Sequence, residues 1–303
     1  MSVDIEIKQG GLFKKNLDLG FLKSLCENYG FSYGISNHAL ALDDYQGGKD
    51  IVGTTFVVYN VKKIGRGFNF WLDSNKRDCY MRLSNPCADS DVNDFYDFLH
   101  TACEMVKAKS FLQDGENKLV EDIFQIRDDI LTWNRTVLRE QIAANYVEWC
   151  IFGAVYPIYL ENSFREQIPH LNDRDMMASY ARYLHDKQAK DHYYAKSIMY
   201  SDDANNVFGR YAITEGVRSV FPLTPYITIG TGLKMETVVS SWSVSLGIFE
   251  DGDYKTAGII SFDDFVSNLN LNESKNVFDA KHVIIELDKK TINSLVEKSA
   301  NEG

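Results

Sequence analysis

The chain has 303 residues, of which 45% are hydrophobic and 25% charged, with a formal net charge of −11. These proportions are those of globular proteins and exclude wholesale disorder. Binding to a nucleic-acid backbone or to an anionic membrane surface needs clustered lysine and arginine, and no such cluster is visible, so we expect neither kind of partner.

The cysteines suggest a reducing compartment. The chain has five, at wide spacings and without a CxxC pair, and such cysteines behave as small buried apolar residues. Asp4 and Glu6 place charges where a secretory signal needs an apolar core. The longest apolar stretch, near 150–160, is far too short to span a bilayer. We therefore expect a cytoplasmic protein.

The first part of the chain is predicted to be mixed. Apolar residues alternate over 3–7, which indicates a strand, and Asp18 is placed to cap a short helix. Residues 51–61 and 68–72 are rich in Val, Thr and aromatic residues and predict a hairpin closed by a glycine turn. A third strand follows over 79–83.

Helices are predicted next. An apolar stripe over 92–106 at spacings of three and four predicts a helix that begins at Ser90 or Asp91. A strand over 109–112 follows. Residues 119–149 keep a helical period for longer than an ordinary helix, so we expect a break or two helices there.

The middle of the chain contains one further strand and one further helix. Residues 153–160 predict an apolar strand that is broken by Pro157. Asn172 or Asp173 is placed to cap a helix that carries apolar residues on one face.

The C-terminal part is predicted to be rich in strands. The two prolines in 221–225 predict a loop, and residues 238–248 alternate almost without a break, which is typical of a strand. The remaining predicted elements are a strand over 256–260, a helix with a Ser261–Asp264 capping box, a strand over 283–287 and a helix capped by Asp288.

Together these elements predict an α+β fold, with antiparallel hairpin sheets packed against helices. We expect an N-terminal α+β domain over 1–115, a mainly helical segment over 116–190 and a C-terminal α+β domain over 191–303. The order hairpin, helix, strand, helix occurs near both ends, which suggests two similar halves from an internal duplication. The alternative is that α+β chains repeat this order by chance.

The first candidate site is a glycine-rich loop. Gly230, Gly232 and Lys234 follow an apolar segment, and glycines after a strand let backbone N–H groups approach an anion to which a lysine adds charge. The spacing matches neither a phosphate-binding P-loop nor a dinucleotide fingerprint. The alternative is an ordinary turn.

Three other groups of residues have side chains that could form a site. Asp97, His100, Cys103 and Glu104 have spacings that fit one helix face and part of a metal site, but no further ligands are identifiable. His185 and His192 have the chemistry of an acid or base without an identifiable nucleophile. The acidic doublets are Asp43–Asp44, Asp128–Asp129, Asp202–Asp203 and Asp263–Asp264, and turns, caps and solvated faces explain most of them. We assign no catalytic residue, metal ligand or cofactor.

The layout of the stretches 56–71, 82–99 and 226–233 resembles a family of uncharacterised proteins from Gram-positive bacteria. That resemblance implies a bacterial cytoplasm and no assigned activity, and it carries over no functional residue.

The function that we expect is that of a non-enzymatic binding or interaction protein. The acidic charge favours a protein partner with a basic surface, and 13% aromatic residues suit an interface. The alternative is a hydrolase or an enzyme that binds a phosphate ligand at 230–234 or through carboxylates.

Overall fold

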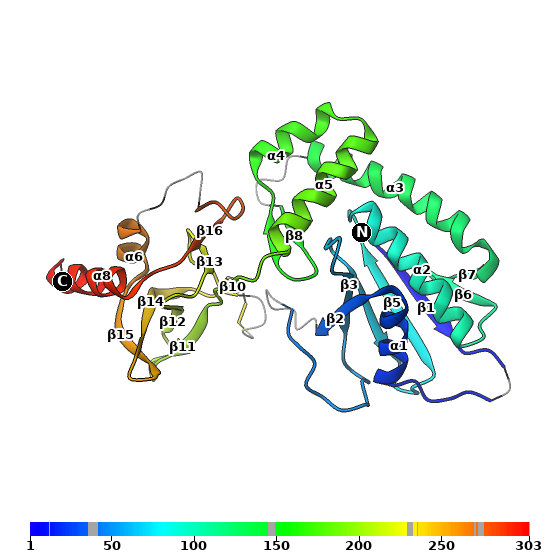
Figure 1. The fold of residues 1–303 in the computed structure, drawn as a ribbon, viewed down its shortest axis with the longest axis horizontal. Helices are drawn as coiled ribbons and strands as arrows, with labels where there is room; N and C mark the ends of the chain where they lie inside the picture. The colour runs from blue at the N-terminus through cyan, green and yellow to red at the C-terminus, as the bar shows by residue number, and fades with distance from the viewer. Residues whose placement is uncertain are drawn as a thin grey trace. The chain divides into compact units, whose positions relative to one another are not determined.

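The computed structural model describes residues 1–11, 13–35, 42–144, 149–228, 233–234, 236–269, 271 and 276–302. Its contacts divide the chain into two compact units, and the boundary falls between Lys190 and Asp191. Each unit combines helices with sheets made largely of antiparallel strands, so the predicted α+β fold is confirmed (Figure 1). The division into three domains stays a prediction. Within the described ranges no helix combines the length and the apolar character needed to cross a membrane.

The first unit is built on a seven-stranded sheet of order β2-β3-β4-β5-β1-β6-β7, in which all neighbours are antiparallel. Its strands are β1 Ser2–Lys8, β2 Phe31–Ile35, β3 Phe56–Asn60, β4 Phe68–Leu72, β5 Asp78–Ser84, β6 Ser110–Gln113 and β7 Glu116–Leu119. Buried and more exposed residues alternate along β1 and β5, because successive side chains of a strand point to opposite faces. One face of the sheet therefore forms the core.

Helices α1 (Leu19–Tyr29) and α2 (Asp89–Met105) supply the other side of this core. The ring of Phe68 on β4 lies 5.4 Å from that of Phe95 and 5.1 Å from that of Phe98, both on α2. Ring pairs at such distances add to the free energy gained from burying apolar area. The stripe predicted over 92–106 is thus the buried face of α2.

The start of α2 differs from the prediction. The helix begins at Asp89, and its N-cap is Ala88 rather than Ser90 or Asp91. Asp91 lies in the first turn, where its carboxylate accepts a hydrogen bond from the backbone N–H of Ala88. In the sequence an aspartate in the first turn of a helix looks the same as an aspartate at the N-cap. The predicted start of α2 was therefore one to two residues too late.

Beyond α2 the chain forms a second, smaller core. Its elements are η1 Val120–Asp122, α3 Ile123–Ala143, β8 Cys150–Phe152, β9 Pro157–Tyr159, α4 Asn162–Gln167, η2 Ile168–His170 and α5 Asp173–Gln188. Helix α3 packs against α2 (Figure 1). It also shares buried apolar side chains with β8, β9 and α5, among them Leu138, Ile151, Ile158 and Tyr180.

Two predictions in this region can be compared with the structure. The helical period over 119–149 does not form one helix over its whole length, because α3 covers only Ile123–Ala143, and residues 145–148 lie outside the described part. The strand expected over 153–160 is wrong in extent, because only β9 lies in that range, and it forms a hairpin with β8 just before it. Pro157 opens β9, a position at which its missing N–H is tolerated.

The second unit contains two sheets, of orders β11-β12-β14-β15 and β10-β13-β16. Its elements are β10 Tyr193–Tyr194, β11 Ile198–Ser201, β12 Val207–Thr214, β13 Ser219–Pro222, β14 Val239–Glu250, β15 Asp253–Ser261, α6 Phe262–Asn268, β16 His282–Ile285 and α8 Lys289–Glu302. Val244, Leu246 and Ile248 of β14 are buried, as the alternation over 238–248 predicts. Helices α6 and α8 pack on β14 and β15.

The loop expected over 221–225 is partly wrong, because Phe221 and Pro222 belong to β13. The parallel neighbour β10 pairs only with Ser219 and Val220. Pro222 lies at the end of β13, beyond β10, and its missing N–H removes no bond to that strand.

The strand orders contradict the duplication hypothesis. In the first unit, β6 follows α2 and joins the same sheet as the β4–β5 hairpin. In the second unit, β16 follows α6 and pairs with β13, in a different sheet from the β14–β15 hairpin. The recurring order of elements therefore reflects no shared topology.

Candidate functional site

Buried polar side chains fix the N-terminus of α2 in the first unit. The amide of Asn134, on α3, donates to the carbonyl of Cys87 and accepts from its N–H, at 2.9 and 3.0 Å. The hydroxyl of Tyr180, on α5, donates to the carbonyl of Pro86. Because buried hydrogen bonds are costly to leave unmade, these contacts hold the segment before α2 against α3 and α5.

Asp91 joins the same segment to the β3–β4 loop. Its buried carboxylate accepts hydrogen bonds from the backbone N–H groups of Arg66, Gly67 and Ala88, each at 3.0 Å. Burial raises the pKa of Asp91 to about 6, and the three hydrogen bonds act against that shift. A Cβ at Gly65 would overlap this carboxylate, so only glycine fits there.

Helix α5 holds the same loop from its other side. The side-chain amide of Gln188 donates to the carbonyl of Gly65 at 2.7 Å. The Nδ1 atom of His185 accepts a hydrogen bond from the backbone N–H of Ile64 at 3.1 Å. A neutral imidazole that accepts at Nδ1 carries its proton on Nε2, so His185 keeps a donor rather than an acceptor for any further contact.

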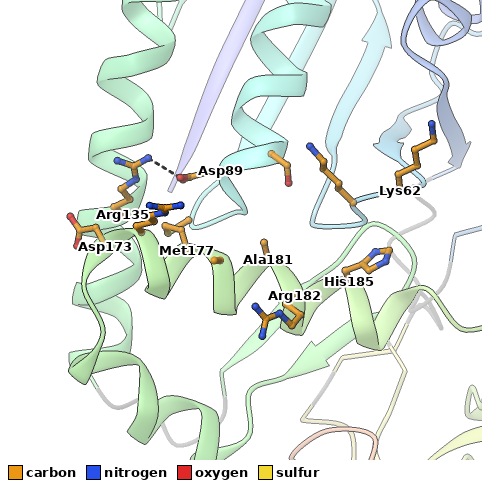
Figure 2. A pocket seen from close by; sticks show the side chains of 12 residues that line it. Lys62, Asp89, Arg135, Asp173, Met177, Ala181, Arg182 and His185 are labelled. Carbon is orange, nitrogen blue, oxygen red and sulfur yellow. Dashed lines mark hydrogen bonds and ion pairs between the residues drawn. The ribbon is translucent and has the colours of Figure 1, made fainter.

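A pocket of about 630 Å³ lies where these segments meet. Figure 2 shows α5 along its length, with the N-terminus of α2, the β3–β4 loop and α3 around it. The lining residues are Lys62, Lys63, Asp89, Ser90, Arg135, Asp173, Arg174, Met177, Ala178, Ala181, Arg182 and His185. All of them belong to the first unit.

The lining is cationic although the chain is acidic. Five lysine or arginine side chains face two carboxylates, and both carboxylates are already neutralised. Asp89 pairs with Arg135 at 2.8 Å, and Asp173 pairs with Arg139 at 2.7 Å. Four cations remain without an ion pair among the described residues, namely Lys62, Lys63, Arg174 and Arg182.

The chemistry of this lining is that of anion binding. Lysine and arginine donate charge-assisted hydrogen bonds to phosphate and carboxylate oxygens, and His185 adds an N–H donor. Proton abstraction needs an acceptor such as a free carboxylate or an unprotonated ring nitrogen. The lining carboxylates that the structure describes are held in ion pairs, and the acceptor nitrogen of His185 is used by Ile64.

The glycine-rich candidate is only partly visible. Gly230 and Gly232 lie outside the described residues. Lys234 is described and exposed, and its carbonyl accepts a hydrogen bond from Thr237 at 3.0 Å. An anion site at this loop stays a prediction.

The four residues on α2 whose spacing fits part of a metal site do not converge on one point. Cys103 is buried in the core, and burial raises the pKa of its thiol to about 12. His100 lies on a more exposed side of the helix, with its Nδ1 3.8 Å from a carboxylate oxygen of Glu104. The described residues contain no group of three or more His, Cys, Asp or Glu side chains arranged to hold a metal ion.

The histidines and acidic doublets are also separated. His185 lies in the first unit, and His192 lies in the second, beyond the end of α5. Asp128 pairs with Arg127, and Asp202 accepts backbone N–H groups within a turn. Ser261, not Asp263 or Asp264, caps α6.

Sequence reasoning missed the pocket cations. Arg174, Ala178 and Arg182 recur every four residues on α5 and so share a face. That face is polar and exposed, whereas the other face of α5 is apolar and buried. The same pattern is typical of an ordinary solvated helix surface. Only the approach of Lys62 and Lys63 from a distant loop makes it a pocket.

A second missed cluster lies in the second unit, around His282. Its Nδ1 is 2.8 Å from Oδ1 of Asp279, and its Nε2 is 3.1 Å from the hydroxyls of both Tyr194 and Tyr226. The side chains of His282 and Asp279 are fully buried. The spacing Asp-x-x-His before a strand was the only sequence signal. Asp279 also accepts the N–H of His282, so this cluster fixes the start of β16.

Comparison with known proteins gives one finding. A family model described as a domain of unknown function, DUF4299, matches residues 2–295. No match was found among curated proteins. None was found among solved structures.

Proposed function

We propose a function from the geometry, since this chain belongs to the DUF4299 family, whose description as a domain of unknown function names no activity. The protein is a non-enzymatic binding protein, and the pocket along α5 holds a small anionic molecule. The observation that carries the proposal is the set of four cations without ion pairs around one pocket.

The size of the pocket supports this proposal. Pockets for small molecules usually measure about 300–1,000 Å³, and this one measures about 630 Å³. The charge supports it as well. Cations that line a concave surface concentrate a positive potential even in an acidic chain.

The state of the acceptors favours binding over catalysis. A hydrolase or a phosphate-transforming enzyme, the alternative, needs a base near the ligand. Asp89 and Asp173 are held by arginines, and His185 accepts from Ile64. Oδ1 of Asp89 accepts no hydrogen bond within the described residues, so one acceptor remains beside Arg135, whereas His185 has none left for a ligand.

The test is isothermal titration of the full chain with phenyl phosphate, a small organic anion. Arg182→Ala is expected to weaken binding about tenfold or more, because an arginine that donates to a phosphate is lost. The matched control is Arg127→Ala, on α3 and outside the pocket, where Arg127 pairs with Asp128. Equal affinities for these two variants would contradict the proposal.

The proposal includes a bacterial cytoplasm as the compartment and a Gram-positive source. Four of the five cysteines, Cys26, Cys79, Cys87 and Cys103, are buried as thiols in the described structure. Burial and a reducing environment both keep such thiols inert. Detection of the protein in a secreted fraction of its host would contradict this part.

A second candidate is a protein-binding face on the β11-β12-β14-β15 sheet. Apolar side chains on its outer face, opposite the buried Leu246, are each at least 44% exposed; they are Ile198, Tyr200, Phe249, Tyr254 and Ile259. Large exposed apolar groups of this kind favour interfaces. In the adjoining turn Glu250 and Asp251 pair with Lys255 and Lys289, so the preference for a partner with a basic surface rests on the net charge of the chain.

This second candidate is tested by replacing Tyr254 with lysine and recovering bound proteins from a bacterial lysate. Wild type is expected to retain a basic protein that Tyr254→Lys loses. Val61→Lys, at a similarly exposed apolar residue in the first unit, is the control. Identical recovery by all three proteins would count against the interface.

A further inference from the structure

The lining of the pocket is not uniform along α5. The lining residues of this helix run from Asp173 to His185, and a rise of 1.5 Å per residue places these ends roughly 18 Å apart. The pocket is therefore elongated along three turns of α5. Figure 2 shows Asp173, Arg135 and Asp89 toward one end and Lys62 and His185 toward the other.

The two ends differ in charge. Both lining carboxylates, Asp89 and Asp173, lie at the first end, each in an ion pair. At the other end Lys62, Lys63 and Arg182 accompany His185, and no lining carboxylate lies there. Asp94, outside the lining, interacts with Lys63, so the attraction for a negative group at the His185 end comes mainly from Lys62 and Arg182.

Between the two ends the wall of α5 is apolar. Met177, Ala178 and Ala181 line this stretch. Alanine offers no hydrogen bond, and the thioether of methionine is only a weak acceptor that adapts to irregular shapes. Met177 is already buried in the core, whereas Ala178 is exposed and Ala181 is half-buried. An inorganic anion would leave these two alanines in contact with water, whereas an apolar group would cover them.

We infer that the ligand is an amphiphilic organic anion, with one phosphate or carboxylate head at the His185 end and an apolar body along Met177, Ala178 and Ala181. This inference rests on the proposed anion-binding function. It adds the direction in which the ligand lies and the requirement for an apolar body.

The first test compares four probes by titration calorimetry on the full wild-type chain. Phenyl phosphate has a phosphate head and an apolar ring. Inorganic phosphate has only the head, and phenol has only the ring. Benzoate has the ring with a carboxylate head. Phenyl phosphate is expected to bind at least tenfold more tightly than inorganic phosphate, because the ring buries apolar area. Phenol is expected to bind too weakly to detect. Whichever of phenyl phosphate and benzoate binds more tightly shows whether the site prefers a phosphate or a carboxylate head.

The direction of the ligand is tested by two variants of the same helix. Arg174 and Arg182 are both exposed, lie two turns apart and lack ion pairs in the described part of the chain. Arg182→Ala is expected to lower the affinity for phenyl phosphate about tenfold, and Arg174→Ala is expected to lower it less than about threefold. Equal losses would overturn the stated direction.

The apolar wall is tested at Ala181. Ala181→Gln is expected to reduce the affinity for phenyl phosphate severalfold toward that for inorganic phosphate, and to leave inorganic phosphate unchanged. Ala189→Gln, at the exposed end of α5 and outside the lining, is the control and should change neither affinity.

The outcomes separate the inference from the function on which it rests. Equal affinities for inorganic phosphate and phenyl phosphate would overturn the amphiphilic ligand and leave an anion site in place. If neither phosphate nor benzoate bound, the proposed function would fail together with the inference.

Discussion

Asp91 is a single residue on which two segments of the first unit depend. Its carboxylate receives N–H groups from the β3–β4 loop and from the residue before α2. It is also buried, and burial raises its pKa to about 6, from an ordinary value of 3.8. Between these two pH values the folded protein holds a proton that the unfolded chain has released. This contribution to stability is full below about pH 4 and is lost as the pH rises through 6.

Asp91→Asn tests this description. A carboxamide turns one acceptor into a donor that faces N–H groups, so we expect a loss of about 1–3 kcal/mol in the free energy of unfolding at pH 7. At pH 4.5 the loss should be about 2 kcal/mol greater, because wild type alone gains from proton uptake there. Urea denaturation at both pH values measures the difference.

The control for this variant is Asp44→Asn, at an exposed residue of the same unit, which should shift stability little at either pH. A loss at Asp91→Asn that stays constant or grows as the pH rises would contradict a raised pKa.

At the scale of elements, the β3–β4 loop meets α2 and α5 too closely for any side chain at Gly65. A Cβ there would overlap the Asp91 carboxylate, while the Gly65 carbonyl accepts hydrogen bonds from Gln188 and from the N–H of Ala154. The same loop carries Lys62 and Lys63 into the pocket. Stability and ligand binding are therefore coupled at this loop.

Gly65→Ala is expected to lower the free energy of unfolding by about 1–3 kcal/mol, because the backbone or Asp91 must shift. It should also lower the affinity for phenyl phosphate, because one wall of the pocket moves. Gly48→Ala is the matched control, because a Cβ there meets no atom within 4 Å. Thermal unfolding with and without ligand gives both quantities, and a Gly65→Ala variant as stable as Gly48→Ala would refute the close approach.

Elements with a strong period were predictable from the sequence. The apolar stripe of α2 and the alternation of β14 depend on local spacing alone, and both are found. The start of α2 and the end of β13 depend on partners far along the chain, which are the β3–β4 loop bonded to Asp91 in one case and β16 in the other. The pocket was not predictable for the same reason, because Arg174 and Arg182 look like solvated residues until α2, α3 and the β3–β4 loop are placed around α5.

At the scale of the whole molecule, the charge of −11 repels anions at a distance, whereas the pocket attracts them nearby. The attraction must therefore be short-ranged and must come from Lys62, Lys63 and Arg182. Exposed charges of this kind are screened by salt, with a Debye length of about 10 Å at 0.1 M.

We accordingly expect the affinity for phenyl phosphate to fall severalfold between about 0.05 and 0.5 M NaCl, as screening weakens the ionic contacts. Calorimetric titration across that range measures how steeply the affinity falls with salt concentration. The affinity of Arg182→Ala should fall less steeply than that of wild type. Affinity that rises with salt would mean that apolar burial alone drives binding.

The most direct measurement of the central claim is the mapping of phenyl phosphate onto the chain by backbone amide NMR. We expect the signals of residues 62–63, 89–90 and 174–185 to shift on titration, with the largest changes near Arg182 and His185. Shifts confined to the neighbourhood of Lys234, or none at any residue, would contradict an anion site along α5.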